Sequence, residues 1–125
     1  MRSAEPAPPR TVALALLADL AAVALFAAVG RRSHAEGLTV AGVLETAWPF
    51  LAGTAVGWVA VRGWRRPTAL TPTGLAVWVA TVVVGMLLRR ATSAGTALSF
   101  VVVASVATAV LLLGWRGVAA LRARR

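Results

Sequence analysis

The chain of 125 residues contains no cysteine, no lysine and no tyrosine, and it has one histidine and only four acidic residues. Without cysteine there is no disulfide framework, no thiol nucleophile and no thiolate metal site. The sequence also lacks the G-x-S-x-G, H-E-x-x-H, P-loop and dinucleotide-binding signatures. These absences argue against an enzyme, and the sequence predicts no cofactor and no metal centre.

Basic residues are in large excess: all thirteen are arginine, and the formal net charge is +9. A charge of this size could indicate a nucleic-acid partner. The arginines, however, lie at the edges of apolar runs, where membrane topology and anionic headgroups place them, and not on one soluble face. We therefore predict contact with membrane lipids and no nucleic-acid binding.

Long apolar runs fill the rest of the chain, of which 59% is hydrophobic, against roughly 45–50% in soluble domains. The runs cover residues 11–30, 38–61, 73–88 and 96–115. About 20 apolar residues cross a bilayer core of roughly 30 Å, and none of the runs shows the polar stripe of a soluble helix. We predict an all-α, polytopic transmembrane four-helix bundle with antiparallel neighbours.

The arginine distribution predicts the orientation of this bundle. Nine arginines lie with the termini and the second connection, whereas four lie on the other side. By the positive-inside rule both termini face the cytoplasm, and we expect a plasma (inner) membrane protein. Residues 1–10 are rich in proline and are expected to form a disordered lead-in. Residues 11–116 would form the membrane domain, and residues 117–125 a basic cytoplasmic tail.

Short motifs recur in the two halves of the chain. Gly63-Trp64-Arg65 ends the second run and Gly114-Trp115-Arg116 ends the fourth, while arginine pairs end the first and third. Two helical hairpins in parallel orientation would give this pattern, as in duplicated membrane proteins. Chance matches among such frequent residues would give it as well, and both explanations stay open.

One carboxylate lies deep inside a membrane run. Asp19 is about 12 Å deep at helical rise, where a charged carboxylate costs at least about 2.5–3.5 kcal/mol. Thr54, Thr81 and Thr108 lie at a similar depth in the other runs, and threonine can donate to a carboxylate. Because no arginine of its own helix is within reach, we expect Asp19 to be protonated in this midplane polar layer. The layer is either a packing clasp or a protonatable functional site.

A second polar group is expected on the non-cytoplasmic side, where Pro49 should also kink its helix. This outer polar cluster comprises Arg31, Arg32, His34, Glu45, Arg89 and Arg90. Arginine forks match phosphate, so the cluster predicts binding of anions or lipid headgroups. Alternatively, the arginines snorkel to the interface, and Glu45 stabilises a helix N-terminus. His34 and Glu36 are too few ligands to predict a metal site.

Several of these motifs together resemble a known family. Their order is Asp19, residues 30–34, Pro49-Phe50, residues 85–89, Ser99-Phe100 and Gly114-Trp115-Arg116. This order is similar to that of the small four-span membrane proteins of domain-of-unknown-function family 3054. The resemblance covers residues 19–116 and implies a four-helix integral membrane protein without an assigned activity.

The leading functional hypothesis is a small transport or permeation component that uses the Asp19 layer and the outer arginines. Four spans rarely enclose a solute path, so this hypothesis calls for a homodimer. The alternative is a lipid-binding or membrane-complex assembly partner that transports nothing. A third hypothesis is an enzyme that acts on a lipid headgroup, but the sequence shows no evident pair of nucleophile and base for it. A polar cavity that reaches Asp19 would favour transport, and a dry layer would favour the alternative.

Overall fold

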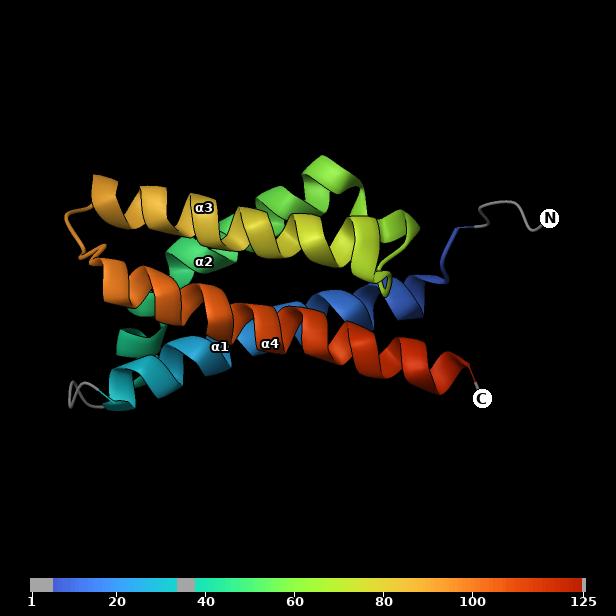
Figure 1. Cartoon of the computed structure of the whole chain (residues 1–125), viewed down its shortest axis with the longest axis horizontal. Helices are drawn as coiled ribbons and strands as arrows, with labels where there is room; N and C mark the ends of the chain where they lie inside the picture. Colours follow the sequence, from blue (N-terminus) through green and yellow to red (C-terminus); the bar gives the residue numbers. More distant parts are fainter. Residues whose placement is uncertain (1–5, 34–37, 125) are drawn as a thin grey trace.

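The computed structural model describes residues 6–33 and 38–124, which form four long helices. Their bounds are α1 Pro9–Ser33, α2 Val40–Val61, α3 Leu75–Ala91 and α4 Leu98–Ala123, with the short turns η1 Gly63–Arg65 and η2 Leu70–Gly74 between α2 and α3. Successive helices run in opposite directions along the long axis (Figure 1). The prediction of an all-α four-helix bundle is thereby confirmed.

Both ends of the chain lie at one end of the bundle, together with the connection from α2 to α3 (Figure 1). We call this the terminal end, and we call the end with the turn from α3 to α4 the distal end. All four helices are long and apolar enough to cross a membrane, the third of them counted from Leu70 to Ala91. The protein is therefore built as a multi-pass membrane protein.

The helices extend beyond the apolar runs seen in the sequence. α1 begins at Pro9, inside the expected lead-in, because proline is well tolerated in a first helical turn. α4 continues from the expected limit at residue 115 to Ala123, so most of the expected tail is helical. The fourth helix thus places Arg116 inside the bundle instead of at its edge.

Glycines bring α2 and α3 into close contact. A Cβ atom on Gly53 would lie 2.6 Å from the Ala80 carbonyl oxygen, and one on Gly57 would lie 2.8 Å from the Val77 Cα atom. Only glycine allows the two backbones to approach so closely. The small-residue pattern of α2 therefore serves packing within the chain.

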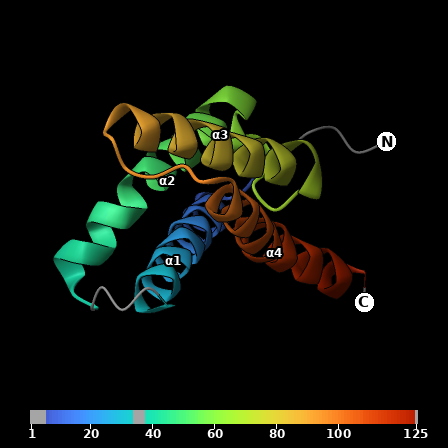
Figure 2. The same cartoon turned by 60° about the vertical axis from the view of Figure 1, so that its left-hand side comes forward.

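Toward the distal end, three aromatic rings join α1, α2 and α4. The Phe26 and Phe50 ring centroids are 5.3 Å apart in an edge-to-face arrangement, and Phe100 lies within 6.4 Å of both. Gly85 of α3 makes room for the Phe50 ring, which a Cβ atom there would meet at 2.5 Å. Pro49 lies inside α2, and Figure 2 shows the first part of α2 diverging from α3 toward the end of α1.

Candidate functional site

The most concentrated polar contacts of the bundle surround Asp19, whose side chain is fully buried. Its Oδ1 atom accepts hydrogen bonds from Trp115 Nε1 at 2.9 Å and Arg116 Nη1 at 2.8 Å. Its Oδ2 atom accepts from Trp58 Nε1 and Arg116 Nη2, both at 2.8 Å. We call these four residues the clasp. Because they come from α1, α2 and α4, the clasp ties three helices together.

Arg116 is also fully buried and uses its remaining donors on the backbone. Nε donates to the Pro67 carbonyl at 3.1 Å and Nη1 donates to the Leu112 carbonyl at 3.2 Å. A Cβ atom on Gly74 would lie 2.8 Å from Arg116 Cδ, so the absence of a side chain in η2 makes room for the arginine. The connection between α2 and α3 is thereby fastened to α4.

At the centre of the clasp, Asp19 and Arg116 form an ion pair in a low-dielectric environment, with both side chains at 0% exposure. Removing two charges from water costs several kcal/mol for each ion, which only good geometry and additional hydrogen bonds offset. The two parallel N–H···O bonds and the two indole donors supply that geometry. Among the residues that the structure describes, no buried side-chain polar atom is left without a partner. The arrangement is that of a saturated structural ion pair.

The sequence-based expectation for the partners of Asp19 was wrong. Its oxygens bond to tryptophan and arginine, whereas threonine was expected. Trp58 follows Thr54 by one turn, so the clasp lies about 6 Å closer to the terminal end than that threonine. Protonation was expected because only arginines of the same helix were considered, and Arg116 supplies the counter-charge from α4.

The threonines of the expected layer are all buried, but they bond among themselves and to their own helices. The hydroxyls of Thr54 and Thr81 are 2.8 Å apart and link α2 to α3. Thr54 also donates to the Phe50 carbonyl, and Thr108 donates to the Ala104 carbonyl. Local bonds of this kind satisfy a hydroxyl inside a helix. These residues therefore pack the middle of the bundle and do not contact Asp19 by hydrogen bonds.

Sequence reasoning missed Trp58, Trp115 and Arg116 as partners of Asp19. The sequence analysis placed both Trp115 and Arg116 at the end of the fourth run. The available signal was the apolar continuation after Arg116, which includes Val118 and Leu121. This continuation indicates that Arg116 lies within a helix and not at its end, and Asp19 is a carboxylate deep inside an apolar run that can neutralise it.

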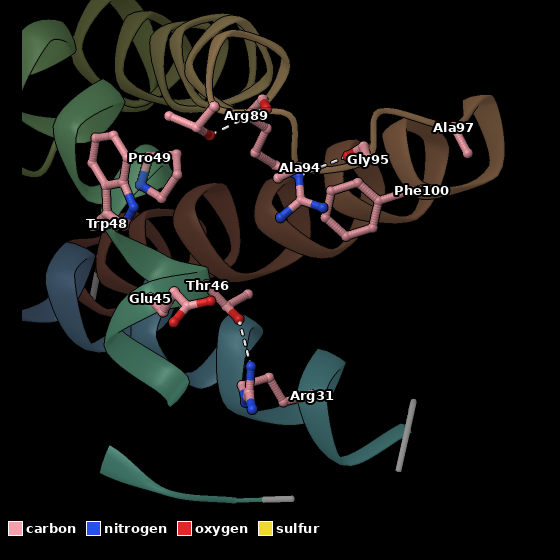
Figure 3. A pocket seen from close by; sticks show the side chains of 11 residues that line it. Arg31, Glu45, Thr46, Trp48, Pro49, Arg89, Ala94, Gly95, Ala97 and Phe100 are labelled. Atoms are coloured by element: carbon pink, nitrogen blue, oxygen red, sulfur yellow. Dashed lines mark hydrogen bonds between the residues drawn. The ribbon is translucent and has the colours of Figure 1, made fainter. Parts of the chain in front are cut away.

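At the distal end lies a cavity of about 600 Å³ that is lined by charged, polar and apolar side chains. Its walls include Arg31, Glu45, Thr46, Trp48, Arg89 and Phe100. Figure 3 shows Arg31 entering from α1 on one side and Arg89 from α3 on the other, with α2 between them. We call this cavity the distal pocket. It brings together three members of the expected outer polar cluster.

Both arginines of the distal pocket are held by neighbouring helices. Arg31 Nη1 donates to Thr46 Oγ1 at 3.3 Å, and its guanidinium lies against Gly42 of α2, where a Cβ atom would be only 2.6 Å away. Arg89 Nε donates to the Gly95 carbonyl at 2.9 Å, and its Cζ atom lies 4.3 Å from the Phe100 ring centroid. Stacking on the ring and the hydrogen bond orient this guanidinium at the pocket wall.

The other members of the outer polar cluster lie elsewhere. Arg90 is exposed on α3 and is not among the lining residues of the distal pocket. The predictions for the Arg32 side chain and for His34 lie outside what the structure describes. Within residues 6–33 and 38–124, no three His, Cys, Asp or Glu side chains gather where they could hold a metal ion.

An apolar groove of about 670 Å³ adjoins the distal pocket between α1 and α4. Leu25, Phe26 and Val29 line it from α1, and Val103 and Leu111 are among its α4 residues. Ala97 and Phe100 line both the groove and the distal pocket, so the two cavities meet at Phe100.

Four helices that are long and apolar enough to cross a membrane define the class, which is that of α-helical integral membrane proteins. Residues 16–119 match the family model described as a protein of unknown function (DUF3054). The match covers most of the chain, which belongs to this family. Comparisons with curated proteins and with solved structures gave no match.

Proposed function

We propose that this chain is a non-transporting integral membrane protein that binds a phosphate-class anion in the distal pocket. The observation that carries the proposal is the presence of Arg31 and Arg89, from two different helices, in the walls of one cavity. With Glu45 as the acidic residue among the lining residues, the formal charge of the pocket is +2 − 1 = +1. Planar guanidinium groups are well suited to phosphate oxygens.

The contacts of the two arginines support binding over simple snorkelling. A snorkelling arginine extends its charged group outward to the headgroup region. Arg31 instead bonds to Thr46 of α2, and Arg89 stacks on Phe100 of α4. Holding a guanidinium by its neighbours reduces the conformational entropy that it loses when an anion binds. The same residues then act as a partly preorganised anion site.

Transport has weaker support from the geometry. The hypothesis of a protonatable transport site requires a path that reaches Asp19, which among the described residues is the carboxylate deep in a span. Asp19 is fully buried in the clasp, and neither the distal pocket nor the adjoining groove includes it in its walls. The homodimer expected for a transporter is not required by a binding site that one chain forms alone.

Binding of a soluble phosphate compound to the distal pocket tests the proposal. The full chain in a neutral detergent is titrated with glycerol phosphate, and binding is followed by nuclear magnetic resonance of the arginine Nε–H groups. Arg31→Gln and Arg89→Gln should each weaken binding about tenfold, since each removes a charge-assisted hydrogen bond. Arg90→Gln is the matched control. No binding by the wild type, or an equal loss in Arg90→Gln, would refute the proposal.

We further propose that the distal pocket faces the non-cytoplasmic side of the plasma membrane. Nine of the thirteen arginines lie with the termini and the second connection, and positive charge of this kind stays in the cytoplasm. A reporter that is active only in the cytoplasm should therefore be active when it is fused after Arg125 and inactive when it is inserted next to Glu36. The reverse pattern would place the pocket in the cytoplasm.

A further inference from the structure

The distal pocket has a polar head and an apolar extension. The extension is the groove between α1 and α4, whose walls are mainly aliphatic and aromatic. Leu25 and Val29 of α1 and Val103 of α4 are each more than half exposed. In a bilayer these side chains face acyl chains, so the groove opens sideways to lipid.

The head and the extension share two wall residues, Ala97 and Phe100. Phe100 lines both cavities, and the Arg89 guanidinium lies over its ring at 4.3 Å from the centroid. An anion bound beside Arg89 would therefore stand at the entrance of the groove. A ligand that continues from the anion into the groove must be apolar beyond its head.

The length of the groove fits one acyl chain. From Phe100 to Leu111 the helix rises about 16 Å at 1.5 Å per residue. A single leaflet accounts for half of the roughly 30 Å hydrocarbon core, which is about the same length. The groove runs from the arginines toward the middle of the bundle, as an acyl chain runs from its headgroup toward the bilayer midplane.

We infer that the ligand of the distal pocket is an anionic phospholipid, with its phosphate at Arg31 and Arg89 and one acyl chain in the groove between α1 and α4. The inference rests on the proposed anion binding and adds the class of ligand. Burial of the chain against the groove contributes affinity in proportion to the apolar area covered, and the two arginines select the anionic head. A water-soluble anion would use the head of the site alone.

Photolabelling tests this inference. The full chain is placed in phosphatidylcholine vesicles that contain a trace of phosphatidylglycerol with a photoreactive group midway along one acyl chain. Labelled positions are mapped by mass spectrometry. In the wild type, labels should concentrate on the walls of the groove, and excess unlabelled phosphatidylglycerol should compete with them.

Two substitutions separate the chain site from the head site. Val103→Trp fills the groove, and Val102→Trp is its matched control, because both residues are exposed on α4 and only Val103 lines the groove. Val103→Trp should reduce groove labelling at least fivefold, while Val102→Trp leaves it unchanged. Arg89→Gln should reduce it about tenfold, since it removes a charge-assisted contact to the phosphate.

Each other outcome has a definite meaning. Equal labelling of all four helices, or equal effects of Val103→Trp and Val102→Trp, would overturn the lipid inference. If Arg89→Gln still weakened binding of glycerol phosphate in that case, the proposed anion site would stand without the acyl-chain site. Loss of labelling in Val103→Trp but not in Arg89→Gln would show a groove that holds any lipid. This result would overturn the inference, whereas the proposed anion binding is decided separately by the glycerol phosphate titration.

Discussion

The two ends of the bundle use arginine in opposite ways. Near the terminal end, Arg116 is sealed from solvent and neutralised by Asp19 at 2.8 Å. At the distal end, Arg31 and Arg89 line a cavity of about 600 Å³ that also contains Glu45. The same type of side chain is therefore internal structure in one region and pocket wall in the other.

This difference separates what holds the fold from what can bind a ligand. The clasp has its two carboxylate oxygens occupied by four donors, so it has no capacity for a further partner. The distal pocket, by contrast, has an open volume next to its charged side chains that a ligand can occupy. Substitutions near the terminal end should therefore change stability, and substitutions at the distal pocket should change binding.

The largest effect is expected when one member of the ion pair is removed. Asp19→Ala leaves Arg116 as an uncompensated buried charge, which should lower the free energy of unfolding by about 3–5 kcal/mol. Denaturant-dependent unfolding of the full chain in detergent micelles measures this. The control is Arg122→Gln, because Arg122 is an exposed arginine on the same helix as Arg116. This substitution should change the free energy of unfolding by less than about 0.5 kcal/mol.

The double substitution Asp19→Ala with Arg116→Leu sharpens this test. It removes both charges, and replacing a buried pair by apolar residues is often neutral or stabilising. The double variant should therefore be more stable than Asp19→Ala alone. The single variants Asp19→Ala and Arg116→Leu complete the comparison. If the stability losses of these two variants simply added in the double variant, Asp19 and Arg116 would not be coupled, which would contradict the ion pair as a stabilising contact between α1 and α4.

A smaller loss is expected from the indole donors. Trp58→Phe keeps the aromatic ring but removes the 2.8 Å bond to Oδ2 of Asp19, which should cost about 1.5–3 kcal/mol because the acceptor is charged. Trp64→Phe is the matched control, since Trp64 is 46% exposed. Thermal unfolding of the two variants compares them directly, and equal Tm values would indicate that the Trp58 bond contributes nothing.

The smallest effect on stability is expected at the distal pocket. Arg89→Gln loses the stacking on Phe100 and the bond to Gly95, which together should be worth about 1 kcal/mol at a partly exposed position. Its effect on anion binding should be larger than this. A loss of stability as large as that of Asp19→Ala would show that Arg89 is part of the structural framework, and the contrast between the two ends would fail.

The fold was predictable because the bilayer imposes it. Four apolar runs of sufficient length leave few alternatives to a helical bundle, and the family resemblance agreed with them. The ends of the helices were less predictable. Polar and charged residues continue a helix wherever tertiary contacts satisfy them, as at Arg116, so hydropathy alone ended the fourth span too early.

The site was predicted only in part for a related reason. The depth of Asp19 indicated that it must have partners, but the identity of those partners depends on how α4 is rotated and shifted against α1. Neither quantity can be read from spacing along one helix. By contrast, Arg31, Glu45 and Arg89 lie at helix ends that the topology brings to one side, and the structure brings all three to the walls of one pocket.

The ion pair between Asp19 and Arg116 is the contact on which the contrast between the two ends of the bundle depends. Infrared difference spectroscopy of the wild type against Asp19→Asn at neutral pH tests it most directly, because the substitution removes only the Asp19 carboxyl signal. The structure predicts that the difference spectrum contains an ionised carboxylate band. A protonated carboxyl C=O band assigned to Asp19 would contradict the ion pair and restore the case for a proton-coupled site.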